Sequence, residues 1–376
     1  MEHYLDNSAT TRVLDAAAQK ALFLMTEEYG NPSSLHTRGF RAKCELEDAR
    51  EILANSLGAE PAELYFTSGG TESNNLAIFG AAQALRRRGN KIVTTAIEHP
   101  SVLEVMKELQ KQGFEVVFLQ PDSRGAVSRE ELEQTVDEKT ILVSMMLVNN
   151  ETGTVQPVKA AAELIRRRRL PALLHTDAVQ AYLKMPLSVS RLGVDLLTVS
   201  GHKVHAPKGV GALYAAKKAR LLPTHFGGGQ EKKLRSGTES LPLIGAFAEA
   251  VRLSGSVREN AEQTGRLNQR LREKLVAVEG VSIHSPEDGL PYILNFSAGR
   301  VKAETMLHYL SAQEIYVSSG SACGRGKPSH VLEAMGLDAG AIDSALRVSF
   351  SRFSTQEDVD ALVQAVAEGL RTLHHA

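Results

Sequence analysis

A cysteine stands in a stretch that is too rich in glycine and serine to form part of a core. The stretch, SSGSACGRGKPSH, runs from Ser318 to His330 and sets Cys323 among glycines, with Arg325 and Lys327 close behind. A buried cysteine normally occupies an apolar run, where it acts as a small hydrophobe. Nearby cations favour the thiolate, which is the nucleophilic form. The pattern therefore predicts a reactive thiol on a mobile loop.

Two charged side chains follow runs that predict buried strands. HTDAVQA places Asp177 after ALLHT, and SGHKVHAPKGVG places Ser200, His202 and Lys203 after VDLLTV. Ligands of open α/β sheets bind at the carboxyl ends of the strands, where these residues should gather. A carboxylate there can pair with a protonated ring nitrogen, and a lysine beside cations can form a Schiff base with an aldehyde. Taken alone, Asp177 would more often cap a helix, and Lys203 would more often be solvated.

A turn with two glycines precedes both residues in the chain. In YFTSGGTESNN the strand should end at about Thr67, and a helix should begin near Thr71. Glycines let successive backbone N–H groups approach an anion, and a helix N-terminus adds partial positive charge. The turn therefore predicts a phosphate site, although a plain turn capped by Thr71 explains the pattern equally well.

Ten short motifs span almost the whole chain in the order in which one enzyme family carries them. They are YLDNSATT, GNPSSLH, TSGGTESNN, EHPSV, VNNETGTVQP, HTDAVQ, SGHKVHAPKGVG, RSGTES, SSGSAC and LRVSFSRF. In these motifs the chain resembles the cysteine desulfurases, pyridoxal-phosphate enzymes of the class V aminotransferase-like family. The resemblance implies the α/β fold of type I pyridoxal-phosphate enzymes, with a mainly parallel central sheet in a large domain and a smaller α+β domain.

The resemblance assigns roles around the cofactor ring. Lys203 would hold pyridoxal 5'-phosphate as a Schiff base and would later act as a base. Asp177 would pair with the pyridine nitrogen, while Gln180 and Asn150 would contact the phenolic oxygen. His99 would stack on the ring and pass protons. From the residues alone, His99 could instead cap the helix that follows it.

The resemblance also assigns contacts to the cofactor phosphate and to the substrate. The phosphate contacts would be Gly70, Thr71, Ser200 and His202, with Thr238 supplied by the neighbouring subunit of a homodimer. Arg347 would clamp the substrate carboxylate, which a planar guanidinium can bind through two parallel hydrogen bonds. Asn150 would contact the substrate as well. Without the resemblance, Arg347 would be an exposed charge on an edge strand.

In this family the cysteine of SSGSAC attacks the sulfur of L-cysteine. The resemblance therefore implies that Cys323 receives the sulfur as a persulfide and that L-alanine leaves. An acceptor protein, either an iron-sulfur scaffold or a tRNA-thiolation enzyme, would collect the sulfur. A selenocysteine lyase, an aminotransferase of the same fold and a non-catalytic sulfur carrier stay open as alternatives. Cys44, in the helical run FRAKCELEDAREIL, is expected to be structural.

The elements that must position these residues can be predicted from periodicity. Short β-branched runs alternate with helical patterns over residues 60 to 215, which predicts a mainly parallel sheet covered by helices. The predicted strands are ELYFT, KIVTT, FEVVFL, TILVSMM, PALLHT, VDLLTVS and GALYAA. From Leu241 to about Val278 we expect one long helical region, and then the strands GVSIHS, YILNFS and ALRVSFSRF with a helix near Ala303. The large domain should cover residues 14–252, and the small domain residues 1–13 and 253–376.

Composition limits the remaining function classes. Lys plus Arg number 43 and Asp plus Glu number 44, so net charge gives no reason to expect a nucleic-acid or membrane partner. Two cysteines without a CxxC pair predict neither a metal site nor a disulfide framework. No apolar run approaches the roughly 20 residues that span a bilayer, and no leader pattern opens the sequence, so we expect a cytoplasmic protein.

Overall fold

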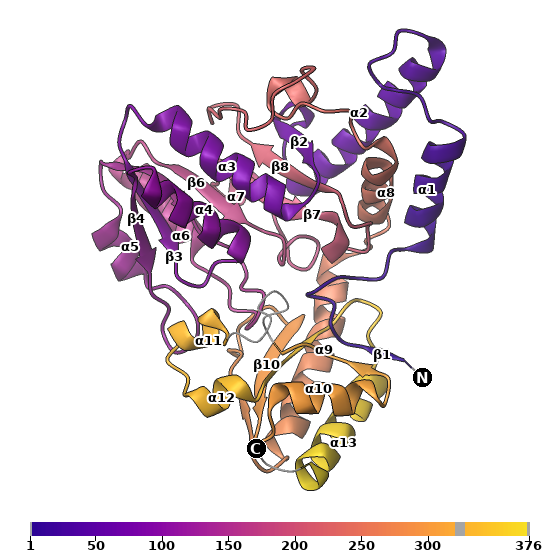
Figure 1. Ribbon diagram of the computed structural model, residues 1–376, viewed down its shortest axis with the longest axis vertical. Coiled ribbons are helices and arrows are strands. Elements are labelled where there is room, and N and C mark those ends of the chain that lie inside the picture. Colours follow the sequence, from indigo (N-terminus) through magenta and orange to yellow (C-terminus); the bar gives the residue numbers. More distant parts are fainter. Residues whose placement is uncertain (1, 320–327, 374–376) are drawn as a thin grey trace.

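A seven-stranded, mainly parallel sheet forms the centre of the larger part of the molecule (Figure 1). The computed structural model describes residues 2–319 and 328–373. The strands are β2 (Leu64–Thr67), β3 (Lys91–Thr95), β4 (Glu115–Leu119), β5 (Thr140–Ser144), β6 (Leu173–Asp177), β7 (Leu196–Ser200) and β8 (Gly211–Ala215), in the order β2-β8-β7-β6-β5-β3-β4. Among these strands, β8 alone runs opposite to the other six. The predicted mainly parallel sheet is confirmed.

Helices cover both faces of this sheet. α3 and α4 pack on one face, where Leu76 and Val102 share a core with Ile92 of β3. The opposite face is covered by α1, α2, α6 and α8, whose apolar side chains share a core with Val143 of β5. Because β5 is buried on both faces, its three middle residues, Ile141, Leu142 and Val143, form a continuous apolar run rather than an alternating pattern. The helices of this part are α1 (Asp15–Thr26), α2 (Thr37–Leu57), α3 (Gly70–Leu85), α4 (Pro100–Lys111), α5 (Arg129–Thr135), α6 (Val158–Arg168), α7 (Val189–Leu192) and α8 (Leu241–Arg252).

A further core forms around a three-stranded antiparallel sheet in a second unit of the molecule. Its strands are β9 (Val281–Ile283), β10 (Ile293–Ala298) and β12 (Ala345–Ser349), in the order β12-β10-β9. The accompanying helices are α9 (Val257–Val276), α10 (Ala303–Ser311), α11 (His330–Ala334), α12 (Ala339–Asp343) and α13 (Gln356–Thr372). β1 (His3–Tyr4) pairs with β11 (Ile315–Tyr316), so the first residues of the chain join this second unit. The exact domain boundaries stay a prediction.

The helical region predicted from Leu241 to Val278 is two helices, so the expectation of one continuous pattern is wrong in this detail. α8 ends at Arg252, and Gly255 then adopts φ of 73°, a left-handed conformation that glycine tolerates. The Ser256 side chain accepts a hydrogen bond from the Glu259 N–H and so caps α9. No helix in residues 2–319 or 328–373 combines the length and apolar character needed to cross a membrane.

Candidate active site

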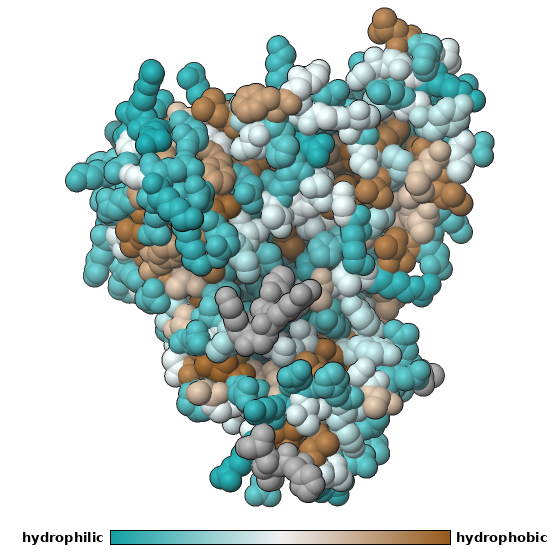
Figure 2. All heavy atoms as spheres, viewed as in Figure 1, coloured by the Kyte–Doolittle hydropathy of each residue, from teal (hydrophilic) through white to brown (hydrophobic). Residues whose placement is uncertain are grey.

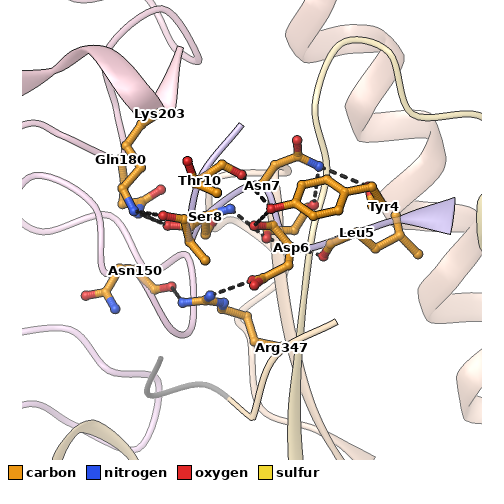
Figure 3. Close-up of polar contacts among 12 residues, drawn as sticks. Tyr4, Leu5, Asp6, Asn7, Ser8, Thr10, Asn150, Gln180, Lys203 and Arg347 are labelled. Carbon is orange, nitrogen blue, oxygen red and sulfur yellow. Dashed lines mark hydrogen bonds and ion pairs between the residues drawn. The ribbon is translucent and has the colours of Figure 1, made fainter. Parts of the chain in front are cut away.

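The predicted site residues gather where β6 and β7 end. Asp177 is the last residue of β6, Ser200 is the last of β7, and the short helix η2 (Gly201–Lys203) follows directly. An N-terminal segment, residues 6–11, passes over this edge and bonds to both parts of the molecule (Figure 3). The Thr11 N–H donates to the His202 carbonyl, and the Asn7 N–H donates to the Ser349 carbonyl of β12.

Lys203 and Gln180 converge on this N-terminal segment. Lys203 Nζ donates hydrogen bonds to the carbonyl oxygens of Ser8 and Ala9, at 2.5 and 2.7 Å. Gln180 Nε2 donates to the same Ser8 carbonyl at 3.1 Å, as Figure 3 shows. Gln180 Oε1 in turn accepts a hydrogen bond from the buried Lys184 ammonium. Two side chains predicted from separate motifs therefore meet at one backbone carbonyl.

Asp177 is 7% exposed, and its carboxylate faces neutral donors. Asn74 Nδ2 donates to Oδ2 at 2.7 Å, and the Val179 N–H donates to Oδ1 at 2.9 Å. Neither donor carries a charge. A protonated ring nitrogen could therefore add a charged partner to this carboxyl group.

The glycine turn between β2 and α3 brings backbone close to β8. A Cβ on Gly211 would lie 2.7 Å from the Gly69 Cα, so only glycine permits this approach. α3 begins at Gly70 with Gly69 as its N-cap, and no side chain caps it. Thr71 is exposed inside the first turn, so the alternative that Thr71 caps the helix is wrong. The first N–H groups of α3 remain available to an anion.

Three further predicted phosphate contacts differ in how deeply they are buried. Ser200 is buried and pairs with Gly211 across the sheet. The His202 ring contacts Thr10 Oγ1 through Nδ1, and burial, reinforced by the charge of Lys203, lowers its pKa to about 4. Thr238 lies on an exposed loop before α8.

His99 is the N-cap of α4, and it lies at the same edge. Its Nδ1 accepts a hydrogen bond from the Ser101 N–H at 3.1 Å and lies 2.8 Å from Ser101 Oγ. Burial lowers the pKa of His99, the Asp177 charge acts in the opposite direction, and the Lys203 charge lowers it further. The capping geometry is present, and it leaves the ring beside Asp177 and Lys203.

Arg347 on β12 approaches the edge from the second unit. Its Nη2 pairs with Asp6 Oδ1 at 2.8 Å, and its Nη1 donates to the Asn150 carbonyl at 3.0 Å. Asn150 therefore contacts Arg347 through its backbone, and Figure 3 shows its side-chain amide pointing away from the guanidinium. Arg347 is 2% exposed, so the expectation of an exposed edge charge, which holds without the resemblance, is wrong.

Comparison with known proteins decides the family. The Aminotransferase class-V family model matches residues 3–362. A cysteine desulfurase IscS of Methanosarcina thermophila is 42% identical over 99% of this chain and 93% of its own length. The chain belongs to the cysteine desulfurase family. A solved NifS-like protein superposes with a TM-score of 0.94 at 40% identity, covering 99% of this chain and all of that one. A structure of SspA in complex with cysteine gives 0.83 at 34% identity, over 94% of this chain and all of that one.

These comparisons confirm the predicted family, the predicted fold class and the predicted pyridoxal-phosphate cofactor. The residues of this chain fit that cofactor. A carboxylate held by neutral donors suits a pyridinium nitrogen, and a helix N-terminus with a glycine turn suits a phosphate. Asn74 Oδ1, which is buried without a hydrogen-bond partner in the described part of the chain, adds an unused polar atom to the same region.

Several residues of this desulfurase-family site escaped prediction from the sequence. They are Asp6, Ser8, Ala9, Asn74, Ser101 and Lys184. Most lie inside motifs that identified the family, but nothing in their local spacing shows which partner each would contact. Ser8 and Ala9 act through backbone carbonyls, which leave no side-chain signal. Lys184 is buried, and burial lowers its pKa to about 7 with help from the charge of Lys203.

The predicted nucleophile Cys323 lies outside the described residues, as do Arg325 and Lys327. The segments on either side of it are fixed near the site. Ser318 exchanges two backbone hydrogen bonds with Arg347, and Ser329 Oγ donates to the Glu151 carboxylate. Cys44 is exposed on α2, so the expectation that it serves a structural role is not supported by burial.

Proposed function

We propose that this chain converts L-cysteine to L-alanine and passes the sulfur through Cys323 to an acceptor protein. One observation carries the proposal: Lys203 and Arg347 both bond to residues 6–11, and Asp177 ends β6, the strand that pairs with the β7 strand leading to Lys203. These groups would hold a cofactor, its Schiff-base partner and a substrate carboxylate within a single site.

The cofactor ring and its phosphate would be held by different groups of residues. Asp177 would accept the pyridinium N–H, Gln180 and Asn150 would face the phenolic oxygen, and His99 would stack on the ring. The phosphate would lie against Gly70, Thr71, Ser200 and His202. When bound, pyridoxal phosphate supplies an electron sink for the pair of electrons released at the substrate Cα.

Lys203 would carry the Schiff base and move the Cα proton. As a neutral amine, Lys203 Nζ could accept the proton from the substrate Cα, and the resulting ammonium would face two carbonyl oxygens. Those acceptors are the carbonyl oxygens of Ser8 and Ala9. Hydrogen bonds to the charged form stabilise it, so the N-terminal segment would assist this proton transfer.

Arg347 would orient the substrate through its carboxylate. The guanidinium is held from two directions by Asp6 and by the Asn150 carbonyl, which fixes its plane. The substrate carboxylate would share this guanidinium with Asp6. A buried arginine can bind carboxylate oxygens bidentately, which a lysine cannot do.

Cys323 would complete the reaction as the sulfur acceptor. Its thiolate would attack the substrate Sγ; the Cβ–Sγ bond breaks, an S–S bond forms on Cys323, and the carbon takes up a proton to give alanine. The anchoring of Ser318 beside Arg347 and of Ser329 beside Glu151 supports delivery of this thiol to the substrate. Chain connectivity ties both anchors to the segment that contains Cys323.

We also propose a homodimer with Thr238 reaching the partner's phosphate site. Large apolar side chains are exposed over α1, the loop after it and the start of α2. They are Leu22, Phe23, Met25, Tyr29, Leu35 and Phe40. Figure 2 shows brown spheres on the side of the molecule where α1 and α2 lie. Clustered apolar exposure of this kind marks protein–protein contact.

The sulfur acceptor would be an iron-sulfur scaffold or a tRNA-thiolation enzyme, and we expect the reaction to take place in the cytoplasm. The two predicted domains, 14–252 and 1–13 with 253–376, would each supply one side of the site. A selenocysteine lyase and an aminotransferase of the same fold remain alternatives, and they differ in the substrate and in the need for Cys323.

The test follows alanine and sulfide release from L-cysteine in the presence of a thiol reductant. We expect both products from the wild type, neither from Lys203→Ala, and both from Lys208→Ala, an exposed lysine five residues away. Cys323→Ser should abolish sulfide release. Faster turnover of selenocysteine than of cysteine would favour the lyase, and full activity of Cys323→Ser would contradict the sulfur-transfer role.

A further inference from the structure

Four side chains form a buried chain of hydrogen bonds that connects Asp177 to His99. Asn74, on α3, is fully buried and its Nδ2 donates to both Asp177 Oδ2 and Ser101 Oγ, at 2.7 and 2.9 Å. Ser101 Oγ lies 2.8 Å from His99 Nδ1. The chain therefore joins the end of β6 to the N-terminus of α4 through a residue of α3.

The direction of each hydrogen bond follows from what each group can donate. A carboxylate only accepts, so the Asn74 amide must turn its NH2 group toward Asp177. Ser101 Oγ accepts from that same amide, and its own proton then points to His99 Nδ1. The Ser101 backbone N–H also donates to Nδ1. With two donors aimed at it, Nδ1 must be an unprotonated acceptor.

We propose that Asn74 is a positioning residue that, through Ser101, holds His99 as a neutral ring with its proton on Nε2 and at the same time orients the Asp177 carboxylate. This inference rests on the proposed function, because it concerns the ring and the carboxylate assigned there to the cofactor. It adds to that function a physical link between the two groups.

The charges around His99 favour the same neutral state. Asp177 faces it from β6, and His202 and Lys203 face it from η2. His330 faces it from α11, and the buried Glu98 precedes it in the chain. Burial, Lys203 and His330 lower the pKa of His99, and Asp177 alone raises it. A second proton would have to bind Nδ1, where it would break the bonds from both donors of Ser101.

The Asn74 side chain bonds to Asp177 and Ser101 through its NH2 group, and its carbonyl oxygen makes no hydrogen bond to the described residues. This oxygen, Oδ1, is buried. A buried polar atom without a partner destabilises the folded chain, and native proteins tolerate it chiefly where function requires the arrangement. An apolar residue at this position would avoid that cost, so stability alone does not explain an asparagine here.

The experiment uses histidine-labelled protein without cofactor, in which nitrogen NMR reports the tautomer and titration of His99. We expect the Nε2–H tautomer in the wild type. Asn74→Ala and Ser101→Ala should both move the titration of His99 to higher pH, because Nδ1 then accepts a proton more readily. Ser101→Thr keeps the hydroxyl and should restore the wild-type titration. Asn75→Ala, on the same helix with its side chain bonded to the Thr71 carbonyl, is the matched control.

A second measurement uses the cofactor-loaded enzyme. Asn74→Ala and Ser101→Ala should lower kcat by roughly tenfold to a hundredfold with a smaller change in KM, because the reacting groups are misplaced rather than removed. The pH dependence of the visible absorption should shift in both variants and remain unchanged in Asn75→Ala.

An Nδ1–H tautomer in the wild type would overturn the inference. So would a His99 titration that is the same in Asn74→Ala, Ser101→Ala and the control while only thermal stability falls. The NMR result does not depend on turnover of L-cysteine. A wild type that fails to act on cysteine but shows these titrations would contradict the proposed function and leave the Asn74 link standing.

Discussion

Glu98 is a fully buried carboxyl group next to His99 in the chain. Its Oε1 accepts hydrogen bonds from the Met146 N–H and from Thr95 Oγ1, both at 2.8 Å, and its Oε2 has no partner among the described residues. Burial raises the pKa of Glu98 to about 8, although those two hydrogen bonds act in the opposite direction. At neutral pH the side chain is therefore mostly protonated, and the site carries one negative charge fewer than the sequence suggests.

This raised pKa predicts how stability depends on pH. Between the ordinary value of 4.5 and about 8, the folded chain binds a proton that the unfolded chain has released. The stability contributed by this carboxyl is therefore full below pH 4.5 and is lost as the pH rises through about 8. Glu98→Gln keeps the acceptor oxygen and cannot ionise. We expect it to gain roughly 1 to 3 kcal/mol over the wild type as the pH rises through this window.

Urea unfolding of both proteins at several pH values measures this difference. Comparing the two proteins at each pH cancels the contributions of the buried histidines, which they share. A difference in unfolding free energy that stays constant across the window would show that Glu98 is ionised in the folded chain.

At the scale of elements, the N-terminal segment and the β2–α3 turn determine where the site residues lie. Residues 6–11 bond to both units of the molecule, and the turn packs against β8 at Gly211. The carboxyl ends of β6 and β7 then supply Asp177 and Ser200. Rigid elements and a close backbone contact therefore set the geometry of the site.

Gly211→Ala tests the close contact between the turn and β8. Its Cβ would meet the Gly69 Cα at 2.7 Å, so the turn must move. We expect a loss of about 1 to 3 kcal/mol in unfolding free energy and weaker binding of pyridoxal phosphate. Gly265→Ala is the control. Gly265 lies within α9, and a Cβ added there would have no atom within 4 Å. That control should gain about 0.5 to 1 kcal/mol.

Thermal unfolding without cofactor and titration with pyridoxal phosphate measure the two effects separately. Unchanged cofactor affinity in Gly211→Ala would show that the turn does not contact the phosphate.

The sequence predicted the strands and the ends of the strands well, because buried parallel strands are short apolar runs bounded by polar residues. Asp177 and Lys203 could be placed at the sheet edge for that reason. Asn74 could not, because its role depends on how α3 crosses β6, which is a property of packing. The break at Gly255 also went unpredicted, since the helical pattern continues on both sides of it.

At the scale of the whole molecule, the two units meet at the site, and an apolar surface over α1 and the start of α2 is exposed. The larger part supplies Lys203 and Asp177, and the smaller supplies Arg347. The exposed apolar residues of α1 and the start of α2 belong to none of the hydrophobic cores. Burial of that surface by a second copy would explain its composition.

A double variant of this surface tests the proposed homodimer. Phe23→Glu with Phe40→Glu places two charges where the contact would form, and Phe40 is 65% exposed in the single chain. We expect a dimeric wild type and a monomeric variant in light scattering, with weaker cofactor binding if Thr238 serves the partner. Val276→Glu, at a 73% exposed position on α9, should remain dimeric. A monomeric wild type would contradict the proposal.

The most direct test of the account follows one turnover with limiting L-cysteine and no reductant. Alanine is counted, and the position of the persulfide is found by mass spectrometry of peptides. We expect equal amounts of alanine and persulfide, with the sulfur on the Cys323 peptide and not on the exposed Cys44. Alanine formed without a persulfide on Cys323, or a persulfide on Cys44 alone, would contradict the account.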